Sequence, residues 1–342
     1  MKVCLIMAGD EEGGLEKHLV ELSNCIVKQV DELTVIAHEK YRQRFLPNIR
    51  FIPLDLSRSR RNPLLLCQLA WILRNEVPDI IHAQANKAVD ILNRIKHFVP
   101  GIRIGTLHSK KKKVAMFSGM HTVIGVSKGV VSELQHPDKR VVYNGILPCY
   151  GRHYSRIELA DKFSLTPTLP ITLSVGRLVP VKAFDNLINA WQPEFGQLLI
   201  VGDGLEKNRL AQLIQKRGLD NYVILTGFCS DVQEMMSAVD LLVVPSHREG
   251  FSYVVAEALL SRLPVLSTRV PVANEILLEQ FLVNVDSVAE LASALHRVLT
   301  NLPETQQQQT VLFDWAANAL TVENMAKKTV EIYNDLLKQS KP

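Results

Sequence analysis

The chain has 342 residues, a length that suits two domains or one large one. Hydrophobic residues make up 47% of it and charged residues 22%, which excludes a disordered chain. Its five cysteines stand apart without zinc-site or redox spacing, so we expect no disulfide framework and a reducing compartment. The longest apolar run, residues 64–73, is too short to span a membrane, and we expect no transmembrane helix or signal peptide.

The net charge of +4 is the sum of a basic N-terminal half and an acidic C-terminal half. Residues 1–150 hold 22 Lys and Arg against 14 Asp and Glu, whereas residues 151–342 hold 17 against 21. This asymmetry predicts that the N-terminal half meets an anionic partner.

Short β-branched runs alternate with amphipathic helical patterns through the first half of the chain. Strands are expected at residues 3–7, 33–37, 79–82, 103–107 and 123–126, and helices at residues 15–28 and 64–74. Repetition of strand, helix and strand favours parallel βαβ units.

A second series begins after a polar segment, residues 149–170, that is predicted to be a linker. Strands are expected at residues 171–175, 198–201, 223–226, 241–244 and 265–267, and helices at residues 183–191, 205–216, 232–238 and 253–260. The polar tract at residues 306–309 is expected to be a loop. A last helix, residues 322–338, has one apolar face.

These patterns predict an α/β fold of two doubly wound, Rossmann-like domains facing a cleft. Residues 1–150 would form the first domain, completed by the last helix crossing back to it, and residues 151–321 the second. Ligands in such sheets bind where strands give way to loops at their carboxyl ends.

The strongest motif reads Pro-Ser-His-Arg-Glu-Gly-Phe-Ser-Tyr-Val-Val-Ala-Glu-Ala, from residue 245 to residue 258. It follows an expected strand directly. Gly250 permits a tight turn, and Ser252 is placed to cap the next helix, whose N-terminus suits a diphosphate. Glu249 and Glu257 are hydrogen-bond acceptors suited to sugar hydroxyls. On spacing alone, an ordinary surface position for Glu257 is an equally good interpretation.

A second motif, Ser-Val-Gly-Arg-Leu-Val-Pro-Val-Lys-Ala-Phe-Asp, runs from residue 174 to residue 185. Arg177 and Lys182 flank a loop after a buried strand. A guanidinium and an ammonium that converge would clamp a diphosphate and offset charge on a leaving nucleotide. Two solvated surface cations are the alternative.

Together these motifs resemble the signature of family-four retaining glycosyltransferases of the GT-B fold. The resemblance implies that Glu249 contacts the donor sugar and Glu257 the ribose of the nucleotide. It places the backbone N–H groups of Gly250, Phe251 and Ser252 near the distal phosphate, and it makes Arg177 and Lys182 phosphate ligands.

Further segments resemble the same family. The Gly-Gly loop at Gly14, the turns at Gly176 and Gly202, and the segment at Phe228 are implied donor-binding positions. His108 ends a strand and is implied to reach the donor sugar. The implied catalytic set is therefore Glu249, His108, Arg177 and Lys182. The family often has a second His where this chain has Gln84, and Tyr143 replaces the Pro of its Pro-Asn-Gly turn.

The chain departs from the family after Glu257. Pro271 and Val272 stand where glycines are usual, and the stretch 277–286 is short. The loop at residues 268–286 is therefore not expected to approach a ligand in the family's way, which leaves the donor open.

The resemblance implies transfer of a sugar, with retention, from a nucleotide-sugar donor, expected to be UDP-linked, to a hydroxyl of a glycan or glycolipid. Lipopolysaccharide core or capsule assembly in a bacterium is the implied setting. The chain has no Asp-x-Asp motif, so no metal or other cofactor is expected, with cations and a helix N-terminus serving instead.

Basic runs indicate a second kind of partner. Lys110–Lys113 either form a solvated loop or meet an anionic acceptor or anionic lipid head groups, and Arg58, Arg60 and Arg61 add a second basic cluster. Contact with lipid would make the protein cytoplasmic and peripheral on the inner membrane. Nucleic-acid binding is not expected, because no aromatic residues interleave with these cations.

Three other functions compete with this interpretation. A Rossmann oxidoreductase would need a Gly-x-Gly-x-x-Gly loop, which residues 9–14 do not supply. A GT-B sugar epimerase or phosphorylase would share the fold. A non-catalytic sugar-binding protein would explain the altered loop at residues 268–286.

Overall fold

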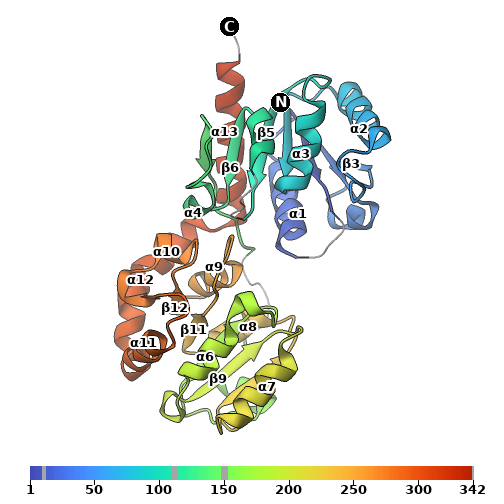
Figure 1. Cartoon of the computed structure of the whole chain (residues 1–342). Helices are drawn as coiled ribbons and strands as arrows, with labels where there is room; N and C mark the ends of the chain where they lie inside the picture. Colours follow the sequence, from blue (N-terminus) through green and yellow to red (C-terminus); the bar gives the residue numbers. More distant parts are fainter. Residues whose placement is uncertain (10–12, 110–113, 148–152, 341–342) are drawn as a thin grey trace. The chain divides into compact units, whose positions relative to one another are not determined.

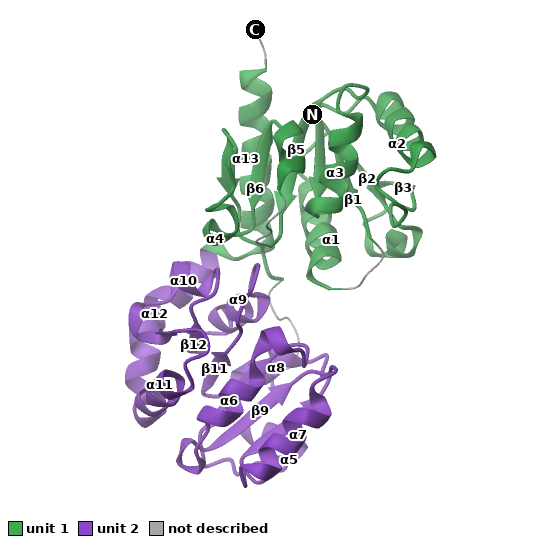
Figure 2. Cartoon of the chain, in the orientation of Figure 1, with its two compact units in different colours: residues 1–147, 319–342 green, residues 148–318 purple. Residues whose placement is uncertain are grey.

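The computed structural model describes residues 1–9, 13–109, 114–147 and 153–340. The chain divides into two compact units, residues 1–147 with 319–342 and residues 148–318 (Figure 2). We call them the N-terminal unit and the C-terminal unit. Each is an α/β unit with its own parallel sheet, and each is described by itself.

The N-terminal unit contains a seven-stranded sheet in the order β3-β2-β1-β4-β5-β6-β7, with every neighbouring pair parallel. Most of the central strands are buried, as expected for a sheet covered on both faces. The strands are β1 (Lys2–Met7), β2 (Glu32–Ala37), β3 (Arg50–Pro53), β4 (Ile80–Gln84), β5 (Ile102–Leu107), β6 (Thr122–Gly125) and β7 (Lys139–Val141).

The described residues of this unit form the α-helices α1 (Gly14–Ile26), α2 (Pro63–Glu76), α3 (Ala85–Ile95), α4 (Lys128–Val131) and α13 (Val322–Gln339). Although α13 comes from the end of the chain, it packs beside α1 (Figure 1). Its buried residues, among them Met325 and Tyr333, join the core formed by α1 and β1. The prediction that the last helix crosses back to the first unit is confirmed.

The C-terminal unit contains a six-stranded parallel sheet in the order β10-β9-β8-β11-β12-β13. Its strands are β8 (Ile171–Val175), β9 (Gln197–Val201), β10 (Val223–Gly227), β11 (Leu241–Val244), β12 (Val265–Thr268) and β13 (Leu282–Val283). Its helices are α5 (Arg156–Phe163), α6 (Phe184–Ala190), α7 (Lys207–Lys216), α8 (Val232–Met235), α9 (Tyr253–Leu260), α10 (Ala273–Ile276), α11 (Val288–Thr300) and α12 (Leu302–Ala319). The predicted pair of Rossmann-like units is thus confirmed.

Two local predictions were wrong. The expected linker at residues 149–170 contains α5, which begins with a capping box between Ser155 and Glu158. The polar tract at residues 306–309 lies inside α12 rather than in a loop. Gln309 is fully buried there, because its side chain bonds both the N–H and the C=O of Val265, at 3.0 Å each.

The strand orders place the sequence motifs at corresponding points of the two sheets. In each sheet the order reverses direction at one pair of strands, β1 and β4 in the N-terminal unit and β8 and β11 in the C-terminal unit. Ligands of open α/β sheets bind at the carboxyl ends of such a pair. The loop at Gly14 follows β1, Gln84 ends β4, Lys182 follows β8 and Glu249 follows β11.

Within the described ranges, none of the helices combines the length and the apolarity that a membrane-spanning segment needs.

Candidate functional site

In the C-terminal unit, the two charged residues of the predicted donor site meet directly. Lys182 ends the short 3-10 turn after β8, and Glu249 lies in the loop between β11 and α9. Lys182 Nζ lies 2.6 Å from Glu249 Oε1, and the two side chains are 21% and 10% exposed. At this burial the pair is a charge-assisted hydrogen bond only partly screened by water.

Neighbouring hydrogen bonds fix Glu249 in place. Ser246 Oγ donates to the same carboxylate oxygen over 2.7 Å. Thr268 Oγ1 in turn donates to the Ser246 carbonyl over 2.6 Å, which ties the loop to β12. The His247 N–H donates to the Val181 carbonyl over 2.9 Å and joins the two loops. Ser246 and Thr268 received no role from the sequence, although Ser246 lies inside the strongest motif.

Two glycines at the predicted donor positions allow close backbone packing. A Cβ on Gly202, whose φ is +145°, would lie 2.0 Å from the Gly176 carbonyl oxygen. A Cβ on Gly176 would lie 3.2 Å from Cε of Lys182. A side chain at Gly202 would therefore separate the loops after β8 and β9, and one at Gly176 would crowd Lys182.

Arg177 and Lys182, which were predicted to clamp a diphosphate together, have different surroundings. Arg177 is exposed, and its guanidinium makes no hydrogen bond or ion pair with the described residues. Lys182 faces Glu249 instead. Of these two cations, Arg177 is thus unpaired within the described part of the chain, and Lys182 already has a carboxylate partner. Phe228, also predicted to be a donor position, is 79% exposed.

The N-terminus of α9 differs from the expected cap. Ser252 occupies the N-cap position, but its side chain makes no cap hydrogen bond, so the predicted capping is wrong. Its ψ of 93° differs from the 158° of Ser155, which does cap its helix. The Ser252 Oγ is buried and has no partner among the described residues. Gly250 and Phe251 precede it, and Glu257 on α9 is half-buried.

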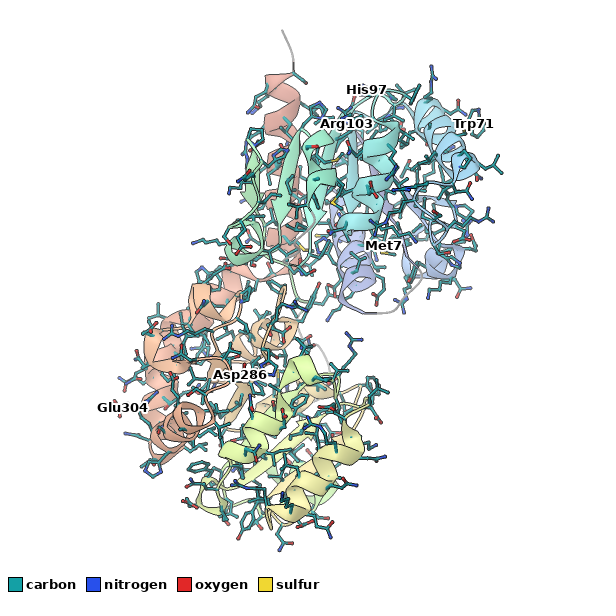
Figure 3. All side chains as sticks on the ribbon, viewed as in Figure 1. Met7, Trp71, His97, Arg103, Asp286 and Glu304 are labelled. Carbon is teal, nitrogen blue, oxygen red and sulfur yellow. The ribbon has the colours of Figure 1, made fainter. Side chains whose placement is uncertain are left out.

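The altered loop at residues 268–286 keeps contact with this site. Val272 has a φ of +74°, so a β-branched residue holds a backbone conformation that favours glycine. Asp286 Oδ1 lies 2.9 Å from His247 Nδ1 and accepts a 3.2 Å hydrogen bond from Asn186 (Figure 3 labels Asp286). The loss of glycines has therefore not removed this segment from the site, and Asp286 is a contact that the sequence did not indicate.

In the N-terminal unit, His108 belongs to a cluster of histidines at the carboxyl ends of β4 and β5. Its Nε2 lies 2.9 Å from Gln84 Oε1, and the His18 ring meets its ring edge-on with centroids 4.7 Å apart. His82 lies behind them, with its ring nitrogens 2.6 Å from Tyr333 Oη and 2.6 Å from Thr106 Oγ1. Gly14 begins α1, the helix that carries His18.

Burial keeps these imidazoles neutral. It lowers the pKa of His82 to about 3 and that of His18 to about 4, the latter effect being partly offset by the neighbouring Asn144. Burial, with the His18 and His82 rings, also lowers the pKa of the half-buried His108 well below its usual value. Neither ring nitrogen of His18 makes a hydrogen bond of good geometry. The cluster therefore offers polar groups without charge.

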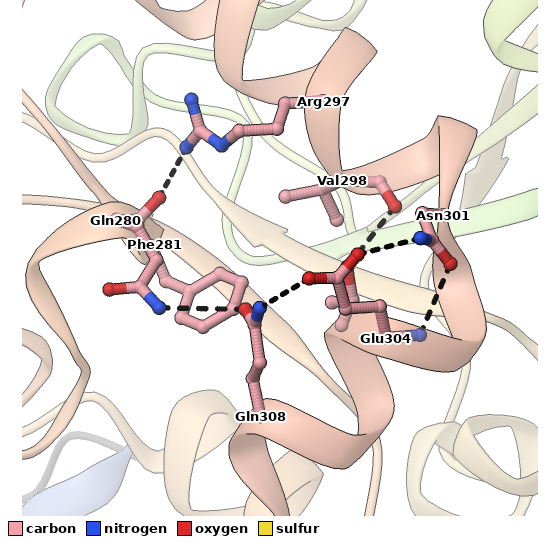
Figure 4. Close-up of a pocket in the computed structure, with 8 residues that line it drawn as sticks. Gln280, Phe281, Arg297, Val298, Asn301, Glu304 and Gln308 are labelled. Carbon is pink, nitrogen blue, oxygen red and sulfur yellow. Dashed lines mark hydrogen bonds between the residues drawn. The ribbon is translucent and has the colours of Figure 1, made fainter.

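Other parts of the chain add little to the candidate site. Lys110–Lys113 lie outside the described residues. No group of three His, Cys, Asp or Glu side chains within the described ranges is arranged to hold a metal ion. A cavity of about 270 Å³ beside α11 and α12 is lined by polar groups that bond one another, such as Gln308 with Glu304 over 3.0 Å (Figure 4).

Comparisons with known proteins agree with this architecture. Residues 155–310 match the family model described as "Glycosyl transferases group 1". The lipopolysaccharide core biosynthesis glycosyltransferase LpsE of Rhizobium meliloti is 26% identical over 269 residues, which cover 76% of each chain. The O-antigen biosynthesis glycosyltransferase WclY of Escherichia coli is 25% identical over 203 residues, which cover 59% of this chain and 57% of WclY.

Among solved structures, Anabaena HepE in complex with UDP superposes with a TM-score of 0.84 at 20% identity, covering 98% of this chain and 100% of HepE. At that identity the likeness shows the fold. The relatives named here are glycosyltransferases, which favours sugar transfer over epimerisation or sugar binding alone. The chain is therefore a glycosyltransferase of the GT-B fold, and its residues 155–310 match the group 1 glycosyl transferases.

Proposed function

We propose that this protein transfers a sugar, with retention and without a metal ion, from a UDP-linked donor to a hydroxyl of a bacterial envelope glycan. The names of LpsE and WclY support an envelope acceptor, in lipopolysaccharide core or O-antigen assembly. The UDP complex of HepE supports the choice of nucleotide.

The observation that carries the proposal is the Lys182–Glu249 pair at the β8–β11 strand ends. An ammonium beside a carboxylate offers a phosphate ligand and a hydroxyl acceptor at one point, the two groups that a nucleotide sugar presents. Among the residues that the structure describes, the Arg177 guanidinium has no partner, and neither has the buried hydroxyl of Ser252 at the start of α9. These groups supply positive charge without requiring a metal bridge.

In the proposed reaction, the diphosphate draws Lys182 toward itself and leaves the Glu249 carboxylate to accept a sugar hydroxyl. The bond from the anomeric carbon to the diphosphate oxygen breaks as the acceptor oxygen bonds to that carbon on the same face. The acceptor proton passes to the departing phosphate. Arg177, Lys182 and the α9 N-terminus offset the charge that develops on the leaving nucleotide.

Substitution of the pair tests the site. Glu249→Ala or Lys182→Ala is expected to lower kcat for sugar transfer by about 100- to 1,000-fold, while the circular dichroism spectrum and the melting temperature stay near those of the wild type. Arg262→Ala is the matched control, because it removes a 2.8 Å ion pair with Asp314 in the same unit. Full activity in both site variants would overturn the assignment.

The donor, the stereochemistry and the metal are tested separately. A thermal-shift screen of UDP-, GDP- and ADP-sugars should give the largest stabilisation with a UDP-sugar. NMR of the first product should show the donor's anomeric configuration, and activity should survive EDTA. An inverted product, or activity that returns only with added Mg²⁺ or Mn²⁺, would contradict the corresponding part of the proposal.

We further propose that the N-terminal unit contacts an anionic membrane surface. A hollow of about 510 Å³ is lined by five cationic side chains together with Ser57, Ser59 and Asp90; the cations are Arg58, Arg60, Arg61, Lys87 and Arg94. Asp90 pairs with Arg60 at 3.4 Å and with Arg94 at 3.3 Å, whereas the Arg61 guanidinium has no partner among the described residues. An excess of positive charge remains for anionic head groups.

Helix α2, which follows Arg58–Arg61 in the chain, carries exposed apolar side chains. Leu64 and Trp71 are 75% and 67% exposed, and their spacing of seven residues puts them on one helix face (Figure 3 labels Trp71). Trp is a typical side chain at membrane interfaces, where its ring contacts the boundary between head groups and acyl chains.

Vesicle co-sedimentation tests this contact. Binding to phosphatidylglycerol vesicles should exceed binding to phosphatidylcholine vesicles and should fall as salt rises. Arg60→Gln with Arg61→Gln, and Trp71→Ser, should each weaken it. Lys28→Gln, an exposed cation on another part of the unit, and Val311→Ser, which is 76% exposed in the C-terminal unit, are the controls. Equal binding to both vesicle types would overturn the proposal.

A further inference from the structure

A chain of hydrogen bonds runs through the interior of the N-terminal unit to His108. It begins at Tyr333 on α13, whose Oη lies 2.6 Å from Nδ1 of His82. Gln84 Nε2 lies 3.4 Å from Nε2 of His82, and Gln84 Oε1 lies 2.9 Å from Nε2 of His108. Tyr333, His82 and Gln84 are at most 1% exposed, so the bonds before His108 are shielded from water.

The amide of Gln84 gives this chain a direction. Its nitrogen can only donate and its oxygen can only accept. With the amide in this orientation, His82 Nε2 carries a lone pair and His108 Nε2 carries a proton. Thr106 Oγ1, 2.6 Å from the same nitrogen of His82, can also donate to it. The His82 proton then lies on Nδ1 and is donated to Tyr333.

We propose that Gln84 is a positioning residue that fixes the tautomer of His108. With its proton on Nε2, the neutral His108 ring presents the Nδ1 lone pair as a hydrogen-bond acceptor. A hydroxyl of a bound sugar would donate to that lone pair. This contact with a sugar rests on the proposed function. Rotation of the Gln84 amide by half a turn would reverse every bond and make His108 Nδ1 a donor.

The backbone around Gln84 supports this role. Gln84 stands at the N-cap position of α3, yet its side chain makes no cap hydrogen bond because it is engaged with the two histidines. The next residue, Ala85, has a φ of +64°, a left-handed conformation that costs about 1 kcal/mol for a residue with a Cβ. Helix α3 therefore begins without a side-chain cap and with a strained Ala85, while the Gln84 amide remains hydrogen-bonded to the two histidines.

The tautomer is measured directly by ¹⁵N NMR of histidine-labelled protein, which contains ten histidines, with His108→Ala used for assignment. The wild type is expected to show His108 protonated at Nε2 and His82 protonated at Nδ1. In Gln84→Leu, which removes both bonds, His108 should become a mixture of tautomers. His108 protonated at Nδ1 in the wild type, or an unchanged tautomer in Gln84→Leu, overturns the proposal.

Kinetics separate positioning from a merely structural role. Gln84→Leu should lower kcat/KM for the donor by about tenfold, the usual scale of one or two lost hydrogen bonds. Gln84→Glu keeps an acceptor for His108 Nε2 and should recover part of that loss. Gln309→Leu is the matched control, a fully buried Gln of the C-terminal unit, and should lower the melting temperature without changing the His108 signals.

The two proposals fail in distinguishable ways. A wild-type protein that transfers no sugar from any nucleotide donor would overturn the proposed function, whereas the NMR result would stand. Activity with the opposite His108 tautomer would overturn the role of Gln84 alone.

Discussion

The two units place unlike chemistry at the carboxyl ends of their sheets. In the C-terminal unit, Lys182 and Glu249 are charged, sit on loops and keep some exposure to solvent. In the N-terminal unit, His18, His82 and His108 are neutral because burial lowers their pKa values. One site is arranged by ion pairing and the other by hydrogen bonding in the interior.

The difference follows from desolvation. A charged pair loses much of its hydration if it is fully buried, so Lys182 and Glu249 remain where a ligand and water can reach them. The neutral imidazole of His82 and the amide of Gln84 can be buried because their polar groups are paired. The charged site must therefore exchange partners when an anion binds, whereas the neutral cluster has its geometry before any ligand arrives.

The largest expected effect concerns the charged pair. Lys182→Ala and Glu249→Ala should each lower kcat by about 100- to 1,000-fold, the scale seen when a preorganised group that stabilises developing charge is lost. The double variant should be little worse than the poorer single variant, because the two side chains act as one unit. A complete double-mutant cycle of kcat measures this, and losses that multiply would show that the residues act separately.

The next effect concerns the neutral cluster and pH. Unfolded histidine takes up a proton near pH 6.5, whereas His18 and His82 stay neutral in the folded unit down to about pH 4 and pH 3. The unfolded state therefore binds more protons as the pH falls below 6.5, and the folded N-terminal unit loses stability, by roughly 2 kcal/mol for each histidine at pH 5.

Hydrogen exchange at pH 7.5 and pH 5.0, corrected for the intrinsic rates, would locate that loss. His18→Gln should remove part of it, since His82 and His108 keep their lowered pKa values. If peptides of the C-terminal unit exchange first at pH 5.0, the expected difference in pH sensitivity between the two units is wrong.

The smallest effect separates two serines at helix starts. Ser155→Ala removes a true cap, since Ser155 Oγ accepts from the Glu158 N–H over 3.2 Å, and should cost about 1 kcal/mol of stability. Ser252→Ala removes a hydroxyl that has no partner and should leave the urea midpoint unchanged or slightly higher. Calorimetry should show UDP binding weakened by about tenfold in Ser252→Ala alone, if a phosphate accepts from this hydroxyl.

Much of the fold could be predicted from local patterns in the sequence. Strands β8 and β11 have the bounds expected from their apolar, β-branched runs, because burial on both faces imposes such composition. The motifs at Lys182 and Glu249 could be placed after these strands for the same reason. The short edge strands β3 and β7 were not predicted, because segments of four and three residues are too short to show a hydrophobic periodicity. Helix α5 was hidden by flanking turn residues although its capping box is visible in the sequence.

The sequence by itself determined the two α/β series, the family resemblance and the residue types at the strand ends. Tertiary structure decided which of those residues meet: Lys182 and Glu249 are 67 residues apart, and His82 and Tyr333 are 251 apart. It also decided that Ser252 does not cap α9, that Gln309 is buried, and that Gln84 faces two histidines. The physical reason is the distance along the chain over which each effect acts. Periodicity and propensity act over a few residues, whereas these contacts depend on how separate βα units pack.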